Sequence, residues 1–175
     1  MMNIRFRSEL NKALVKAREI VRYYRTGPLG DVAAANGKIV EESLRHVLES
    51  MGKAPVTTNG LVDLGVAKWG AGFQVKTFRR KVNRMIFARS NKVGKTARIA
   101  DIRDRVATSL TKTETKHLVL MDYDMFSSDV NLYLLASLVD GKVKTFGSFL
   151  TEENVSTSDR DTHFCIKKEG LLKIA

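Results

Sequence analysis

The sequence contains little cysteine, proline or aromatic residue. Among 175 residues there are one cysteine and two prolines, and aromatic residues make up 7%. A lone cysteine, Cys165, excludes an internal disulfide and a zinc site built on cysteines. So little proline, with 43% hydrophobic residues, predicts a globular chain. The low aromatic content argues against an RNA-binding protein that stacks bases on strand aromatics.

Long apolar runs are also missing. The longest, 130–139, is far shorter than a membrane span and contains Asn131 and Ser137. The first 21 residues are basic but include Glu9 and Glu19 and have no uninterrupted apolar core, so no signal peptide is expected. These absences favour a reduced, cytoplasmic protein with no membrane partner. The length predicts one domain, since it allows one sizeable core and not two.

Carboxylates are absent from a long internal stretch. No Asp or Glu occurs from Leu64 to Ala100, and the chain carries 30 Lys and Arg against 19 Asp and Glu, a formal net charge of +11. A solvated surface is the ordinary explanation of such a run. A stretch without any acid instead favours nucleic acid, whose binding releases counterions and depends strongly on salt. The cations expected to contact DNA are Arg79, Arg80, Lys81, Arg84, Arg89, Lys92, Lys95 and Arg98.

Periodicity and turn residues divide the chain into elements. Apolar residues at helical spacing predict a helix over 3–25, and Asp31 as N-cap with Gly52 after the last turn predicts a second over 31–51. The order that follows predicts an α/β protein with a mixed sheet flanked by helices. The other expected elements are strands at 54–60, 61–67 and 72–80, a short helix around 82–87, a loop at 89–96, a helix at 97–112, strands at 117–124 and 130–138, a hairpin strand at 142–149 and an edge strand at 162–168.

The segment "GFQVKTFRR" alternates apolar and polar side chains, as a strand with one buried face does. Phe73, Val75 and Thr77 would point to one face of the sheet. Gln74 and Lys76 would point to the other, because successive side chains of a strand alternate. A polar pair therefore shares one face of this strand.

Two carboxylates precede this strand. In "GKIVEESLRHVLESMG", Glu41 falls at the margin of the apolar stripe of the helix and Glu42 nearly opposite its centre. Asp63 lies in "LVDLGV", where an acid is disfavoured within a strand. Glu42 should lie on the surface. Taken alone, Glu41 is more simply explained as a residue at the boundary of the buried face and Asp63 as a residue at a strand edge. Together with Gln74 and Lys76 they would gather oxygen ligands and one ammonium group at one end of the sheet, a set that suits Mg²⁺.

The order of these elements resembles the PD-(D/E)XK nuclease superfamily, which has the restriction-endonuclease-like fold. "GKIVEESL" is similar to its Glu-bearing helix, "LVDLGV" to its Asp strand and "FQVKT" to its Glu/Asp-x-Lys strand; "IADIRDRVATSL" and "HLVLMDYD" are similar to the helix and strand that follow. The resemblance spans about 31–125. It implies an αβββαβ core in a single domain, 1–175, with an extra helix at 3–25 and C-terminal strands at 130–175.

This resemblance implies a Mg²⁺-dependent endodeoxyribonuclease, with Mn²⁺ as a substitute cation. Glu41, Asp63 and Gln74 would ligate the metal. Lys76 would activate water, and cleavage would leave a 5′-phosphate. The compact chain best fits a Type II restriction endonuclease that acts as a homodimer on a short palindrome in double-stranded DNA. A Holliday-junction resolvase is the close alternative, and a non-catalytic basic nucleic-acid-binding protein is the alternative of a different class.

Two residues depart from the family pattern. Val62 replaces the usual Pro, a common variation. Gln74 replaces the usual acid; its carbonyl can still ligate a cation, but the loss of one negative charge should weaken metal binding. A natural Q-x-K variant and a Glu→Gln substitution made to trap a complex both explain this glutamine, and the sequence does not separate them.

Other polar residues carry weaker signals. His46, His117 and His163 lack the spacing of metal ligands, so packing or surface roles are expected. Asp122 and Asp124 share a face of their strand and could form a metal pair. However, they follow the expected lysine strand by a whole helix. We therefore interpret them as surface residues at a strand end.

Overall fold

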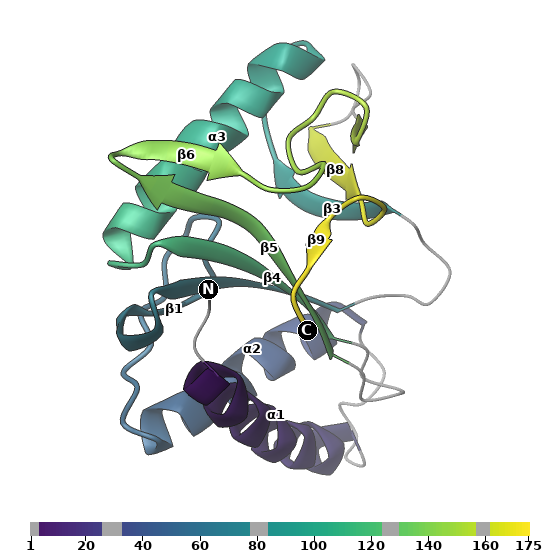
Figure 1. Ribbon diagram of the computed structural model, residues 1–175. Coiled ribbons are helices and arrows are strands. Elements are labelled where there is room, and N and C mark those ends of the chain that lie inside the picture. The colour runs from purple at the N-terminus through teal and green to yellow at the C-terminus, as the bar shows by residue number, and fades with distance from the viewer. Residues whose placement is uncertain (1–3, 26–32, 78–83, 124–129, 157–161) are drawn as a thin grey trace.

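The protein is an α/β structure in which helices flank a mixed sheet (Figure 1). A mixed sheet flanked by helices is the fold class that the sequence predicts. In the described part of the chain, no helix is both long and apolar enough to cross a membrane. The computed structural model describes residues 4–25, 33–77, 84–123, 130–156 and 162–175.

The main sheet has six strands in the order β1-β2-β4-β5-β6, with β9 paired to β5. β2 and β4 run parallel, and the other neighbouring pairs are antiparallel. A short 3-10 helix, η1 (Ala67–Trp69), and Gly70 in the left-handed conformation make the tight turn between β1 and β2. The strands are β1 (Leu64–Val66), β2 (Ala71–Thr77), β4 (His117–Tyr123), β5 (Val130–Val139), β6 (Lys142–Thr145) and β9 (Leu172–Lys173).

A small sheet stands apart from the main one, with the order β3-β8-β7. It contains β3 (Arg84–Arg89), β8 (His163–Lys167) and β7 (Val155–Ser156). A strand is present where the sequence predicts one at 162–168, but its predicted edge position is wrong, because β8 lies between β3 and β7. The expected helix around 82–87 is also wrong from residue 84 onward, and residues 82–83 lie outside the described part of the chain. Burial along β3 alternates with a period of two, as a strand with one face on a core requires.

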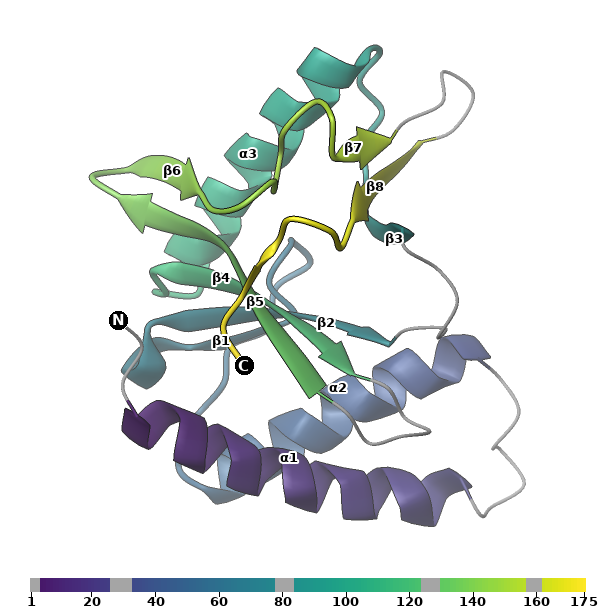
Figure 2. The same cartoon turned by 45° about the vertical axis from the view of Figure 1, so that its right-hand side comes forward.

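Three helices cover the main sheet. α1 (Ile4–Arg25) and α2 (Ala33–Ser50) lie against one face, and α3 (Lys95–Lys112) lies with the small sheet over the other (Figure 2). These bounds agree with the predicted helices to within about two residues, which is the usual uncertainty at helix ends. Residues 31 and 32 lie outside the described ranges.

The core is divided by β4 into two halves. Leu118 and Leu120 pack into the cluster beneath α3 and the small sheet. Val119 and Met121 pack into the cluster beneath α1 and α2. All four side chains are completely buried, so β4 is covered on both faces. β4 therefore lies between the two clusters of the core, with β2 as its parallel neighbour.

The segment before β1 is less regular than the sequence predicts. The expected strand at 54–60 is reduced to one isolated bridge between Val56 and Gly65. The expected strand at 61–67 begins only at Leu64. Asp63 therefore lies just outside β1, at the point where the pairing with β2 ends.

Candidate active site

The carboxylate of Asp63 closes an open edge of β2. Antiparallel pairing between β1 and β2 ends with Leu64 opposite Phe73, and the last backbone bond runs from Asp63 N–H to the Phe73 carbonyl at 2.8 Å. The next outward N–H of β2, that of Val75, donates to Asp63 Oδ2 at 2.7 Å. A partly buried backbone donor is thus satisfied by a side chain instead of a strand. This bond fixes the carboxylate beside β2.

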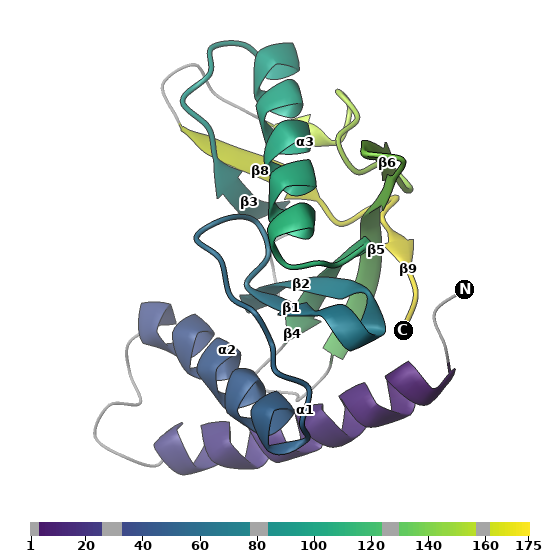
Figure 3. The same cartoon turned by 90° about the vertical axis from the view of Figure 1, so that its left-hand side faces the viewer.

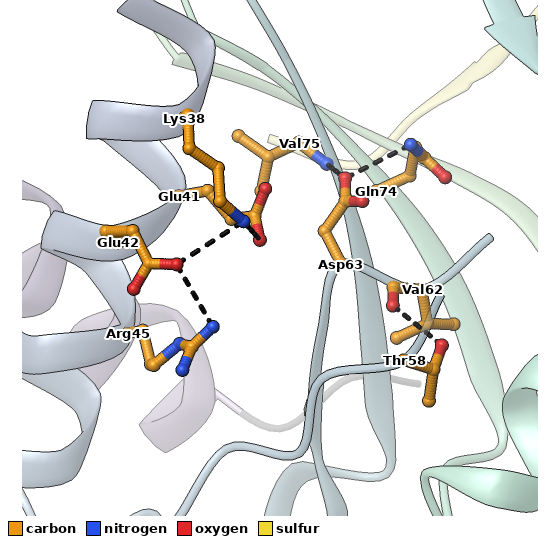
Figure 4. A network of polar contacts seen from close by, with 9 residues as sticks. All are labelled: Lys38, Glu41, Glu42, Arg45, Thr58, Val62, Asp63, Gln74 and Val75. Atoms are coloured by element: carbon orange, nitrogen blue, oxygen red, sulfur yellow. Dashed lines mark hydrogen bonds and ion pairs between the residues drawn. The ribbon is translucent and has the colours of Figure 1, made fainter. Parts of the chain in front are cut away.

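Gln74 is buried beside that carboxylate and is only partly satisfied. It is 4% exposed, and its Nε2 donates to Asp63 Oδ2 at 3.1 Å (Figure 4). Its Oε1 is buried and accepts no hydrogen bond from any of the described residues. This amide orientation follows from the chemistry, because an ionised carboxylate can only accept. A buried polar atom without a partner is costly and rare in folded proteins, so it marks a position where a ligand atom would be stabilising.

Charges of both signs meet at Asp63. Burial raises the pKa of Asp63 to about 6, and the negative charge of Glu41 acts in the same direction. The hydrogen bond from Val75 and the positive charge of Lys76 oppose this shift. Burial also lowers the pKa of Lys76 from its ordinary value, against the attraction of Asp63 and Glu41. These mutual effects show that the two acids and the lysine lie close together.

α2 contributes Glu41 from the margin of its buried face, as its position in the sequence predicts. The Glu41 side chain is 17% exposed and the Glu42 side chain 47%. Glu41 accepts from Lys38 Nζ at 2.8 Å, whereas Glu42 pairs with Lys38 at 3.3 Å and with Arg45 at 3.1 Å (Figure 4). Sequence reasoning missed Lys38, although its spacing of three and four residues from these acids was a usable signal.

The cluster offers a small set of oxygen ligands. Asp63 and Glu41 supply carboxylates, and Gln74 supplies an amide oxygen without a partner. In the described ranges, no group of three or more His, Cys, Asp or Glu is arranged to hold a metal ion. Mg²⁺ commonly takes one or two protein carboxylates and completes its shell with water and substrate phosphate. Two acids and an unsatisfied amide oxygen are compatible with such a site.

Comparison with known proteins gives no family for this chain. No protein-family model, no curated protein and no solved structure matches it. The function must therefore be inferred from the chemistry and geometry of the site.

The cations expected to contact DNA are not equally accessible. Arg84, Arg89 and Lys92 are exposed, and Lys95 is half-buried at the start of α3. Arg98 is only 5% exposed, and its Nε donates to the Lys92 carbonyl at 2.6 Å, so it supports the loop before α3 instead of presenting a surface charge. The remaining members of the set, Arg79, Arg80 and Lys81, lie outside the described residues.

Asp122 is buried, which corrects its interpretation as a surface residue. It is 3% exposed and forms an ion pair with Lys168 Nζ at 2.5 Å. Its neighbour across the parallel pair is Lys76, which places Asp122 on the strand next to the candidate site. Asp124 lies outside the described ranges.

The histidines lie in unrelated surroundings. His117 shares a hydrogen bond of 2.7 Å between its Nδ1 and Ser137 Oγ, and burial lowers its pKa. His46 is exposed on α2, and His163 is half-buried at the start of β8. No group of metal-ligating side chains forms around them in the described ranges.

Proposed function

We propose that this protein is a metal-dependent DNA endonuclease of the PD-(D/E)XK kind. The main support is the buried Oε1 of Gln74, which lacks a partner beside Asp63 at the edge of β2. A cation at this position would satisfy the amide oxygen and neutralise the acids. Glu41 and Lys76 complete the set that such a nuclease needs.

The order of elements also supports the proposal. α2 precedes the antiparallel pair β1–β2, α3 follows, and β4 then pairs parallel with β2. A restriction-endonuclease-like core has this succession, with the bridge at Val56 in the place of its first strand. β3, which joins the small sheet, would be an insertion. α1 and the strands after residue 130 would be additions outside the core.

Each residue of the cluster would have a distinct role in hydrolysis. A bound Mg²⁺, held by Asp63, Gln74 and Glu41, would supply Lewis-acid stabilisation of charge on the phosphodiester. Lys76 would hold the attacking water by a hydrogen bond and accept its proton as the oxygen bonds to phosphorus. The bond from phosphorus to the 3′ oxygen would break, and this oxygen would take a proton from a solvent water, giving a 5′-phosphate and a 3′-hydroxyl. Lys38 would hold the Glu41 carboxylate in position.

The electrostatics of the cluster suit these roles. Because burial lowers the pKa of Lys76, more of this amine is neutral near physiological pH than in an exposed lysine, and a neutral amine can accept a proton. Asp63, with a pKa raised to about 6, is ionised above that pH and can then ligate a cation. Both conditions are therefore favoured as pH rises above about 6.

The proposed substrate is double-stranded DNA, cut at a short specific site by a homodimer, as in a Type II restriction endonuclease. We expect plasmid DNA to be cut in excess Mg²⁺ and left intact when EDTA replaces the cation. Discrete bands on a gel would indicate a restriction enzyme, and cutting confined to four-way junctions would indicate a resolvase. Salt-sensitive binding without cleavage in Mg²⁺ or Mn²⁺ would contradict the proposal and indicate a non-catalytic binding protein.

Asp63→Asn tests the site assignment. The asparagine oxygen can still accept from the Val75 N–H, so the fold of the edge is retained while the charge is lost. We expect the cleavage rate to fall by more than about 10–100-fold, which is the loss typical when a residue that only supports a metal ligand is mutated. DNA binding measured in EDTA should persist. Glu42→Gln is the matched control, because Glu42 is exposed on the same helix; its cleavage rate should equal that of the unmodified protein.

A further inference from the structure

A polar pocket lies between α3 and the loop that leads to Asp63. Thr58, Asn59 and Gly60 line it from the loop, and Arg105, Ser109 and Lys112 line it from α3, around a volume of about 180 Å³. The loop runs along the C-terminal half of α3 (Figure 3). The pocket is smaller than the roughly 300–1,000 Å³ of pockets that hold drug-sized ligands. It suits a small group such as a phosphate.

Hydrogen bonds fix the frame of this pocket. Leu61 N–H donates to Ser109 Oγ at 2.9 Å, and Thr58 Oγ1 donates to the Val62 carbonyl at 3.1 Å. The loop packs closely against α3 at Gly60, because a Cβ on this residue would lie only 2.3 Å from Ser109 Oγ. The loop is therefore held against α3 immediately before the candidate site.

The chemistry of the lining favours an anion. Arg105 and Lys112 lie two helical turns apart on one side of α3, and no carboxylate lines the pocket. Arg105 is oriented by donating to the Arg89 carbonyl and by Asp101 Oδ2 at 3.7 Å. Among the described residues, the Lys112 ammonium makes no hydrogen bond or ion pair. Two cations, hydroxyl groups and an amide match a tetrahedral anion with several acceptor oxygens.

We propose that this pocket binds a backbone phosphate of nucleic acid near the scissile position. Gly60 and Asp63 are three residues apart, so their Cα atoms lie within about 11 Å of each other. Successive phosphates of one strand rise by about 3.4 Å along the axis of duplex DNA and are farther apart in space, so a phosphate in the pocket would lie within a few nucleotides of the one at Asp63. The identity of this ligand rests on the proposed function, whereas the anion-binding character of the pocket does not.

Lys112→Ala tests the pocket through the salt dependence of DNA binding. Fluorescence anisotropy with a labelled duplex in EDTA measures binding without cleavage. Losing one phosphate contact should reduce the slope of log K against log salt by about 0.9. Arg103→Ala is the matched control, because Arg103 is an exposed cation of α3 placed about 180° around the helix from Lys112. It should leave the slope unchanged. Equal effects of the two variants would overturn the proposal.

Position-specific duplexes make the test sharper. In a series of duplexes, each carries one neutral methylphosphonate in place of a phosphate. At one position this replacement should weaken binding to the unmodified protein, and at the same position it should not weaken binding to Lys112→Ala any further. Additive losses at every position would overturn the proposal. So would inorganic phosphate or a mononucleotide that binds through Lys112 while duplex binding stays unchanged. Absence of cleavage together with the methylphosphonate result would reject the nuclease function and retain the phosphate pocket. Lys112→Gln, with thermal melting, checks that any loss is not one of folding.

Discussion

Gln74 is the residue on which the metal chemistry depends most. Its Nε2 donates to Asp63 and its Oε1 is buried without a partner, so one end of the amide stabilises the acid and the other end is unsatisfied. A glutamate at this position would lose the donor and place two carboxylates about 3 Å apart. Like charges at this distance cannot both be ionised without a counter-charge, which a divalent cation provides.

We therefore expect Gln74→Glu to make the protein more dependent on metal. Without a divalent cation, its free energy of unfolding at pH 8 should fall by about 1–3 kcal/mol, because a hydrogen bond to a charged group is replaced by repulsion. Mg²⁺ should raise its melting temperature by more than it raises that of the unmodified protein. Thermal melting with and without Mg²⁺ checks this expectation. An equal Mg²⁺ shift in both proteins would contradict the assignment of residue 74 as a ligand.

Asp63 should make the protein less stable as pH rises. Its pKa is about 6 in the folded protein against an ordinary value of 3.8, so the folded state binds this proton more tightly than the unfolded state does. The resulting stabilisation is full below about pH 4 and is lost as pH rises through about 6. Two pKa units correspond to an upper limit of about 3 kcal/mol.

Asp63→Asn removes this titration. The variant should be more stable than the unmodified protein at pH 8, by about 1–3 kcal/mol, and equal to it at pH 4. Urea denaturation at the two pH values measures the difference. Asp104→Asn removes an exposed carboxylate of α3 and is the control for the change in net charge. A variant that is less stable at pH 8 would show that the ionised carboxylate is a stabilising group and would contradict the raised pKa.

At the scale of elements, local patterns predict the helices well and the strands unevenly. Each helix carries its apolar stripe within its own sequence, and α1, α2 and α3 begin and end close to their predicted limits. β3 was mistaken for a helix because its partner, β8, lies far along the chain and no short window contains both. The central place of β8 was missed for the same reason. Strand pairing is a tertiary property.

In the candidate site, too, local patterns predict some features, whereas others depend on tertiary pairing. The alternation in β2 and the helix margin at Glu41 predict which residues face the cluster, and the structure brings these residues together. Neither pattern predicts the bond from Val75 N–H to Asp63 or the orphaned oxygen of Gln74, since both depend on where β1 ends. The burial of Asp122 was missed because its partner, Lys168, is 46 residues away.

At the scale of the whole molecule, a partly buried ion pair links the small sheet to the main one. Lys168 directly follows β8, and Asp122 lies on β4 beside the strand that carries Lys76. Asp122 is almost fully buried, and Lys168 supplies an opposite charge that offsets the cost of burying its carboxylate. The pair joins the part of the chain after residue 162 to the centre of the core.

Lys168→Met should therefore weaken the attachment of the small sheet to the main sheet. Removing the Lys168 ammonium should lower the free energy of unfolding, by at most the about 3–5 kcal/mol that breaking a fully buried ion pair costs. The Lys168→Met, Asp122→Asn double variant should recover part of this loss. Hydrogen exchange should accelerate in β8 more than in β2. Lys167→Met, at the neighbouring half-buried position, is the control and should leave both measurements near those of the unmodified protein.

The place of Asp63 at the end of β1 has a consequence for solubility. Beyond Phe73, the outward edge of β2 has no strand beside it among the described residues, and an open edge can pair with a strand of another molecule. The Asp63 carboxylate already occupies the Val75 N–H that such a strand would need first. The side chain best placed for the proposed chemistry thus also blocks the hydrogen bond with which a strand from another molecule would begin to pair.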